Sequence, residues 1–263
     1  MNNNHNAHGL GNLDDLFQSA QDDGLTADTM DLVVSNLNGP TMMSAVGVPL
    51  DLLSGNEVTL AMNIVDMSGS MQPFADDLIS AYNDDYLAAM ALSSSADDIL
   101  VSTIFFEDQV QLFHGYLNLQ DVPRLSRRIY RPGATTALYD AVAAGLTNMV
   151  LYAQQLRQCG VIVRCLALVY SDGEDNASRQ PAPAVRRAVE ELLKHEIYTL
   201  AYVGFRNGGL SEQALRQMAD TIAFPEILTS GMGRTELQRT FRMASMSTIN
   251  VSQGHPASSG VFS

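Results

Sequence analysis

The sequence predicts an α/β fold in which helices cover both faces of an open, doubly wound, mostly parallel sheet. From residue 57 onward, apolar segments of strand length alternate with longer segments whose apolar residues recur at helical spacing. The strand segments are continuously apolar, which is typical of strands buried on both faces. Because crossovers between parallel strands are right-handed, this alternation favours one sheet with helices on both sides.

Six segments are expected to be strands, five of them parallel. They are residues 58–66, 98–106, 109–116, 161–170, 197–205 and 224–230. The link between the second and third strands is too short for a crossover, which predicts a hairpin. The third strand is therefore expected to be an antiparallel edge strand.

Helical spacing first occurs after the first strand, over residues 74–93, where Pro73 suits the start of a helix. The other expected helices are residues 137–158, 182–196, 210–222 and 233–250. These segments supply the crossovers between the parallel strands and the cover after the last strand.

We expect three regions along the chain. They are an N-terminal extension over residues 1–57, a main domain over residues 58–248 and a flexible C-terminal tail over residues 249–263. The extension combines a helix-like pattern with a connection rich in Gly and Pro, and it is expected to pack on the main domain or flank it. The tail is expected to fray.

The chain has 263 residues and a formal net charge of −14, from 29 acidic and 15 basic residues. Nucleic acid and anionic lipid are bound by clustered Lys and Arg, so this balance argues against both as partners. It suits a bound cation or a basic partner surface. One local exception is the arginine cluster Arg124, Arg127, Arg128 and Arg131, which could form a solvated face or steer an acidic partner.

The expected location is the cytoplasm. No apolar run is long enough to cross a bilayer, and the first residues have neither the basic region nor the apolar core of a secretory signal. Cys159 and Cys165 have neither metal-site spacing nor a disulfide framework, so both are expected to be reduced thiols in the core.

Three polar segments fall beyond the carboxyl ends of the predicted strands, where ligands bind in such sheets. Their hydroxyl and carboxylate side chains are those of Asp66, Ser68, Ser70, Thr135, Thr136 and Asp172. Such an all-oxygen set suits a hard cation, Mg²⁺ or Mn²⁺ with Ca²⁺ also open. Because most of these groups are neutral, the cation would keep enough charge to attract a carboxylate from another molecule.

The same pattern argues against catalysis. An enzyme of the aspartyl-phosphate type would have a second carboxylate two residues after Asp66, where this chain has Ser68. No His or Lys follows any of the three segments as an obvious general base. We therefore expect no enzyme activity and no catalytic residues.

Taken together, "DMSGSM", "GATTAL" and "YSDGEDN" resemble the metal-ion-dependent adhesion site of von Willebrand factor type A domains. The resemblance implies a Rossmann-like fold and a complete metal site made of Asp66, Ser68, Ser70, Thr135 and Asp172. Thr135 is preferred to Thr136 because the family's threonine usually stands two residues after the first glycine of its loop. The resemblance favours the cytosolic bacterial branch, which includes stress-response members.

The expected function is binding of another protein, through its Asp or Glu, at the metal site. That partner could be an ATPase, a kinase or a phosphatase encoded nearby. Two alternatives stay open. One is an accessory subunit of a separate AAA+ ATPase in a chelatase- or MoxR-like system, since this chain has no phosphate-binding loop of its own. The other is a hydrolase that uses water on the same cation.

Overall fold

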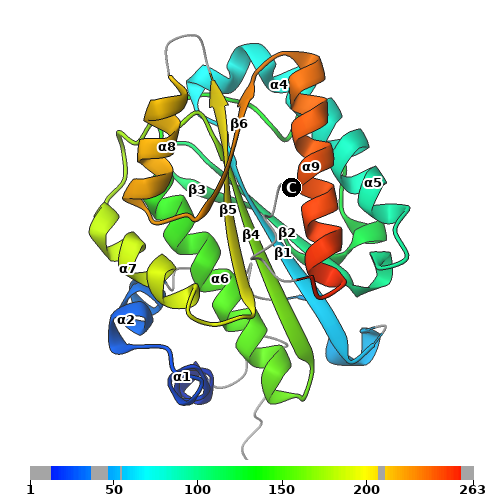
Figure 1. The fold of residues 1–263 in the computed structure, drawn as a ribbon, viewed down its shortest axis with the longest axis vertical. Helices are drawn as coiled ribbons and strands as arrows, with labels where there is room; N and C mark the ends of the chain where they lie inside the picture. The colour runs from blue at the N-terminus through cyan, green and yellow to red at the C-terminus, as the bar shows by residue number, and fades with distance from the viewer. Residues whose placement is uncertain (1–12, 37–46, 54, 207–210, 256–263) are drawn as a thin grey trace, which may run out of the picture.

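The computed structural model describes residues 13–36, 47–53, 55–206 and 211–255. At its centre lies a six-stranded sheet with the order β3-β2-β1-β4-β5-β6 (Figure 1). The strands are β1 (Glu57–Asp66), β2 (Ile99–Phe106), β3 (Val110–Asn118), β4 (Ile162–Ser171), β5 (Tyr198–Arg206) and β6 (Glu226–Gly231). All neighbours are parallel except β2 and β3, which form the expected antiparallel hairpin. The predicted fold class is confirmed.

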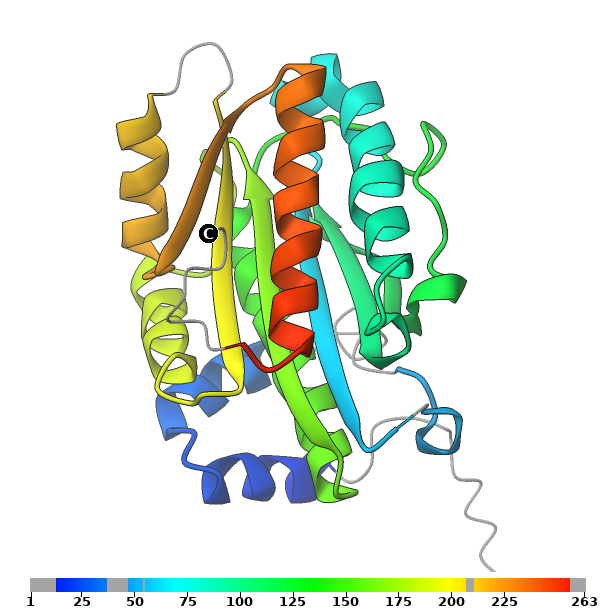
Figure 2. The same ribbon diagram turned by 45° about the vertical axis from the view of Figure 1, so that its right-hand side comes forward.

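Helices cover both faces of the sheet. On one face α6 (Leu138–Gln158) contacts β1, β2 and β4, while α7 (Ala182–Leu192) packs on α6 and α8 (Glu212–Thr221) contacts β5. On the other face α9 (Arg234–Ser252) lies beside the helical segment 75–91 (Figure 2). Strand β1 is buried between these layers, so its last residue lies near the middle of the sheet edge.

Alternating side chains of β1 fill the two halves of the core, as the two-residue period of a strand requires. Leu60, Met62 and Ile64 join the cluster that contains α6, whereas Ala61 and Val65 join the cluster that contains α9. Gly145 of α6 lies so close to the sheet that a Cβ atom there would be 2.5 Å from Ile64 Cδ1. The helix therefore approaches β1 as closely as a glycine permits.

The helix expected over residues 74–93 has a more varied structure. It starts as a 3₁₀ turn, Gly69–Phe74, continues as α4 (Ala75–Ser80), widens into a π-helical segment, Ala81–Leu87, and ends as α5 (Ala88–Ala91). The π segment contains the buried polar residues Asn83 and Asp85. Because apolar periodicity does not register an extra residue in a turn, the sequence pattern did not predict this change.

Part of the N-terminal extension forms two helices against the main domain. These helices, α1 (Leu13–Asp22) and α2 (Ala27–Ser35), contact α6, and α2 also contacts α7. Figure 1 shows them at the lower end of the molecule, opposite the carboxyl ends of the parallel strands. Residues 1–12 and 37–46 of the expected extension lie outside the described residues.

Two expectations need correction. The last helix continues through Ser252, beyond the expected start of the tail at residue 249, because Val251 is buried and Gly254 is the first helix breaker. Residues 256–263 lie outside the described part. Cys165 is buried as expected, but Cys159 follows the end of α6 and is exposed. Among the described residues, no helix combines the length and apolar character needed to cross a membrane.

Candidate metal centre

Asp66 is the last residue of β1 and is fully buried. Its carboxylate accepts two hydrogen bonds: Oδ1 from the backbone N–H of Ser68 at 2.8 Å and Oδ2 from the hydroxyl of Ser171 at 2.6 Å. The hydroxyl of Tyr130 donates to the backbone oxygen of Asp66 at 2.5 Å. The side chain is therefore held in one position at the sheet edge.

Ser68 and Ser70 follow Asp66 at the start of the next helical segment. Ser68 is buried and Ser70 is half-buried, and their hydroxyl oxygens lie 3.0 Å apart. The bond from the N–H of Ser68 to Asp66 forms a tight turn that places the Ser68 hydroxyl near the carboxylate, with the Ser70 hydroxyl next to it. The structure thus brings together the first three predicted ligands.

Asp172 follows the last residue of β4, the strand next to β1, and only 1% of its surface is exposed. Its Oδ1 atom has no hydrogen-bond partner among the described residues. Asp172 lies close enough to Asp66 for the two charges to repel each other. The fourth predicted ligand is therefore a buried carboxylate with an unused acceptor, directed by its strand to the same edge of the sheet.

The loop with the two threonines is fixed to the Asp66 turn by its main chain. The N–H of Gly133 donates to the backbone oxygen of Met67 at 3.0 Å, and the N–H of Gly69 donates to that of Ala134 at 3.2 Å. Ala134 has a φ of 50°, a left-handed conformation that glycine adopts more easily. The alanine at this position therefore carries some backbone strain.

The two threonines differ in exposure. Thr135 is exposed, whereas Thr136 is buried and its backbone is bonded to Asn176, whose side chain accepts from the N–H of Thr136 at 2.8 Å. Thr135 thus lies on the solvent side of its loop and Thr136 on the inner side.

The loop that follows β4 (residues 172–181), called the aspartate loop, also caps α6. The hydroxyl of Ser178 accepts from the N–H groups of Tyr139 and Asp140 at 3.0 and 3.2 Å. Asp140 in turn accepts from the N–H groups of Arg179 and Gln180. These bonds satisfy the first free N–H groups of the helix and fix the aspartate loop to the start of α6.

The pKa values of several buried groups at this edge of the sheet are raised. Burial, and secondly the charge of Asp172, raise the pKa of Asp66 to about 6, while the hydrogen bonds from Ser171 and Ser68 act in the opposite direction. Tyr130 and Tyr202 border the same carboxylates, and their pKa values are raised chiefly by burial and then by nearby groups that include Asp66 and Asp172. Two buried carboxylates side by side disfavour a second negative charge.

A divalent cation fits these residues. The unused Oδ1 of Asp172 is a buried acceptor, and unpaired buried acceptors are costly. Asp66, Ser68 and Ser70 add oxygen donors of the kind that hard cations prefer. No group of three or more His, Cys, Asp and Glu side chains suited to a metal occurs within the described residues, so a site here depends on hydroxyls.

Sequence reasoning missed the residues that hold the ligands in place. Ser171 and Tyr130 both donate to Asp66, and Asn176 accepts from the N–H of Thr136. Ser171 could have been predicted from the sequence, because it precedes Asp172 at the end of a predicted strand. The contacts of Tyr130 and Asn176 join residues 64 and 40 positions apart in the sequence, so no local pattern predicts them.

Comparison with known proteins is informative only for the fold. No protein-family model and no curated protein sequence matches this chain. Among solved structures, the pilus adhesin SpaC from Lactobacillus rhamnosus GG matches with a TM-score of 0.57 and 11% identity, over 75% of this chain and 30% of that chain. The PilB minor pilin from Streptococcus sanguinis matches with a TM-score of 0.53 and 14% identity, over 81% of this chain and 65% of that chain.

A von Willebrand factor type A structure from Catenulispora acidiphila matches less well, with a TM-score of 0.46 and 14% identity, over 74% of this chain and 43% of that chain. This chain thus spans less than two thirds of each of these solved chains. Identities this low carry no information on ligands or partners. What the comparisons show is that this chain has an α/β fold shared with parts of the SpaC adhesin and the PilB pilin.

Proposed function

We propose that this protein is a metal-dependent protein-binding module and not an enzyme. The observation that carries the proposal is the buried Asp172 carboxylate, whose Oδ1 has no partner and which lies beside the buried carboxylate of Asp66. Asp66, Ser68, Ser70, Thr135 and Asp172 are the residues that would hold Mg²⁺, Mn²⁺ or Ca²⁺. When bound, the cation supplies a positive charge that can take an oxygen from outside the chain.

Each of the five residues would have its own role in binding the cation and the partner. Asp66 is positioned by its bonds to Ser68 and Ser171, while Asp172 offers a free acceptor. The hydroxyls of Ser68 and Ser70 contribute oxygens without adding negative charge. Thr135 lies exposed on its loop, where a partner can approach. An Asp or Glu of the partner is the ligand that best complements such a site.

Binding rather than hydrolysis is favoured by the side chains near the site. The loops at residues 66–72, 131–137 and 171–181 contain neither His nor Lys. These loops therefore lack the His and Lys side chains that often act as general bases, and the Asp66 carboxyl, whose pKa is raised, is buried and already bonded to Ser68 and Ser171. On the resemblance of the three motifs alone, we place the protein in the bacterial cytoplasm, in a stress-response or other multiprotein assembly.

The test compares metal binding and partner binding in matched variants. Asp172→Asn removes a charge without removing any recorded hydrogen bond of the loops, whereas Asp66→Ala would also break the Asp66 turn. Glu174→Gln is the control, because Glu174 is exposed on the same loop and the change in charge is identical. Calorimetric titration with Mg²⁺ and Mn²⁺ is expected to show binding to the wild type and Glu174→Gln, and at least tenfold weaker binding to Asp172→Asn.

Affinity capture from the native cell lysate then tests the partner. A protein retained by the wild type and Glu174→Gln in Mg²⁺, but lost in EDTA and with Asp172→Asn, is the expected result. Equal retention in all four conditions would contradict metal-dependent binding, and hydrolysis of phosphoesters that depends on Asp172 would contradict the non-enzymatic role.

A further inference from the structure

The arginine segment, residues 124–131, leads directly into the threonine loop and contains Arg124, Arg127, Arg128 and Arg131. We propose that Arg128 and Arg131 form a second contact for the partner, binding acidic side chains next to the carboxylate that meets the metal centre. The partner would thus present an acidic segment rather than a single Asp or Glu. This inference rests on the proposed function and specifies the chemistry of its partner.

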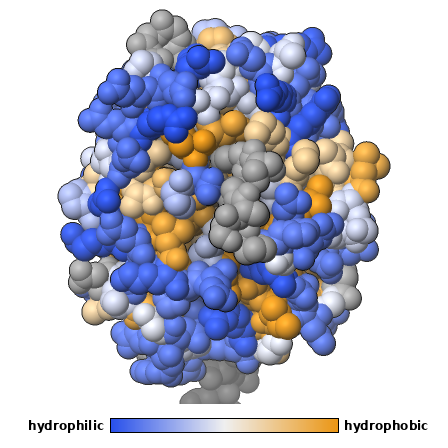
Figure 3. All heavy atoms as spheres, in the orientation of Figure 1, coloured by the Kyte–Doolittle hydropathy of each residue, from blue (hydrophilic) through white to orange (hydrophobic). Residues whose placement is uncertain are grey.

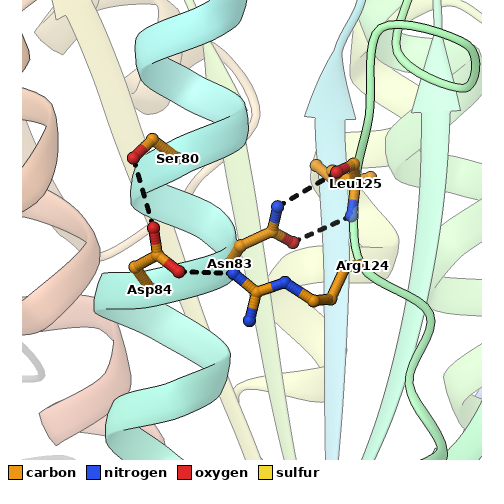
Figure 4. Close-up of polar contacts among 5 residues, drawn as sticks. All are labelled: Ser80, Asn83, Asp84, Arg124 and Leu125. Carbon is orange, nitrogen blue, oxygen red and sulfur yellow. Dashed lines mark hydrogen bonds and ion pairs between the residues drawn. The ribbon is translucent and has the colours of Figure 1, made fainter.

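One end of the arginine segment is fixed to the helix that follows the Asp66 turn. Buried Asn83 makes two hydrogen bonds with the backbone of Leu125: its side-chain amide donates to the backbone oxygen at 3.0 Å, and its side-chain oxygen accepts from the N–H at 2.8 Å (Figure 4). Next to it, Arg124 pairs with Asp84, which also accepts a bond from Ser80. The buried Asn83 contact is the stronger anchor, since exposed ion pairs contribute little.

The other end is fixed to the candidate metal centre itself. Arg127 pairs with Asp76 at 2.5 Å, and Tyr130 donates to the backbone oxygen of Asp66. The N–H of Arg131 contacts the sulfur of Met67 at 3.3 Å. Because Met67 separates Asp66 from Ser68, Arg131 starts from the rim of the proposed site.

This arrangement divides the four arginines into two pairs. Arg124 and Arg127 are engaged with carboxylates of the neighbouring helix, whereas Arg128 and Arg131 are exposed and have no recorded side-chain ion pair within the described residues. In a chain with a net charge of −14, Arg131 at the rim of the site and Arg128 three residues before it would attract an acidic segment locally. Their planar guanidinium groups suit paired hydrogen bonds to carboxylates.

The charge reverses farther along the same rim. The Glu107 carboxylate lies beside Gly133, 3.7 Å from where a Cβ atom would stand. An acidic segment would therefore be attracted to the arginine segment and repelled near Glu107, which fixes its direction on the surface. The upper end of the molecule is mostly hydrophilic in Figure 3, as recognition by charge requires.

The test uses a displayed library of random twelve-residue peptides as the probe. Selections are made with the wild type in Mg²⁺, the wild type in EDTA, Arg128→Gln/Arg131→Gln in Mg²⁺, and Arg239→Gln in Mg²⁺. Arg239 is the control because it is exposed on α9, has no recorded ion pair among the described residues and is separate from the arginine segment. Metal affinity of each protein alone is measured in parallel.

The wild type and Arg239→Gln are expected to select, in Mg²⁺ only, peptides with several acidic residues. Arg128→Gln/Arg131→Gln is expected to bind those peptides about tenfold more weakly, with unchanged metal affinity, and to select peptides with one acidic residue. Identical peptides and affinities for the wild type and the double variant would overturn the inference and leave the proposed function standing. No Mg²⁺-dependent selection by the wild type would overturn both.

Discussion

Asp66 and Asp172 are both buried aspartates at strand ends, but only Asp66 is held by recorded hydrogen bonds from neighbouring groups on both of its carboxylate oxygens. Asp172 keeps an unused acceptor. Replacing Asp66 therefore alters the shape of the loops as well as the charge, whereas replacing Asp172 alters mainly the charge. This difference gives each residue its own experimental signature.

Asp172→Asn is expected to stabilise the metal-free protein. Without a cation the two buried carboxylates repel each other, so removing one charge should raise the free energy of unfolding in EDTA by about 1 kcal/mol. In Mg²⁺ at a hundred times the wild-type Kd the order reverses, because the wild type gains about 2.7 kcal/mol of binding energy and a variant that binds at least tenfold more weakly gains at most about 1.4 kcal/mol. Urea denaturation in EDTA and in Mg²⁺ measures both; a variant less stable than the wild type in EDTA would contradict the repulsion.

His114 on β3 is expected to make stability depend on pH. Burial lowers its pKa to about 4, although hydrogen bonds to the backbone of Gly115 and Val101 favour the charged form. The unfolded chain takes up a proton near pH 6.5, before the folded protein does, so stability present above that pH is lost as pH falls toward 4. The loss amounts to at most about 3 kcal/mol.

The measurement for His114 is the difference between the wild type and His114→Gln in urea denaturation from pH 7.5 to 4. The difference isolates this residue from other groups, such as the carboxyl of Asp66, that titrate over the same range. The wild type should lose more stability than the variant as pH falls. Parallel curves would mean that His114 is protonated equally easily in both states.

Among the elements, α6 and β1 are packed with no room to spare at Gly145. Gly145→Ala would gain about 1 kcal/mol of helix propensity, but its Cβ would meet Ile64, and overpacking costs about 1–3 kcal/mol. The expected result is a lower melting temperature than that of the wild type. Adding Ile64→Val removes the Cδ1 atom that lies 2.5 Å away and should restore part of the loss; a more stable single variant would refute the close contact.

At this scale most of the fold was predictable from sequence, because strand and helix periods are local properties. The first strand, predicted at residues 58–66, occupies Glu57–Asp66, and the predicted hairpin pairs β2 with β3. The π segment at Ala81–Leu87 was not predictable, because it accompanies the Asn83 contact with Leu125 forty-two residues away. The end of α9 was predicted too early, because the residues around Val251 are polar and the sequence gives no sign that Val251 is buried.

The candidate site was predictable to a similar degree, for a different reason. The rule that ligands bind at the carboxyl ends of parallel strands placed Asp66 and Asp172 at one edge, and the structure has them there. Thr135 and Thr136 differ in exposure, and no local pattern predicts that difference. The anchors Ser171 and Tyr130 depend on contacts between distant loops and appeared only in the folded chain.

Across the whole molecule, the N-terminal helices and the candidate metal centre lie at opposite ends (Figure 1). Glu191 of α7 holds α2 in place by accepting from the N–H and hydroxyl of Thr26 and from the hydroxyl of Thr29. Glu191→Ala should therefore loosen α1 and α2, at a cost of about 1–3 kcal/mol, and leave metal affinity unchanged.

Hydrogen exchange over residues 13–35, together with calorimetric titration of Mg²⁺, measures both effects of Glu191→Ala. Glu190→Ala is the control, because Glu190 is an exposed neighbour whose recorded bond is a surface ion pair with Arg186. If the metal affinity falls together with the protection of residues 13–35 from hydrogen exchange, the two ends of the molecule are coupled.

The main-chain bonds that join Met67 to Gly133 and Gly69 to Ala134 have a practical consequence for protein engineering. They hold two loops together without using the hydroxyls of Ser68, Ser70 or Thr135, so the framework and its ligand set are encoded separately. Exchanging those hydroxyls for carboxylates would retune the site toward larger cations that take more charged ligands, such as Ca²⁺ or lanthanides. The main-chain bonds between the two loops would then hold a new set of ligand side chains in the same positions.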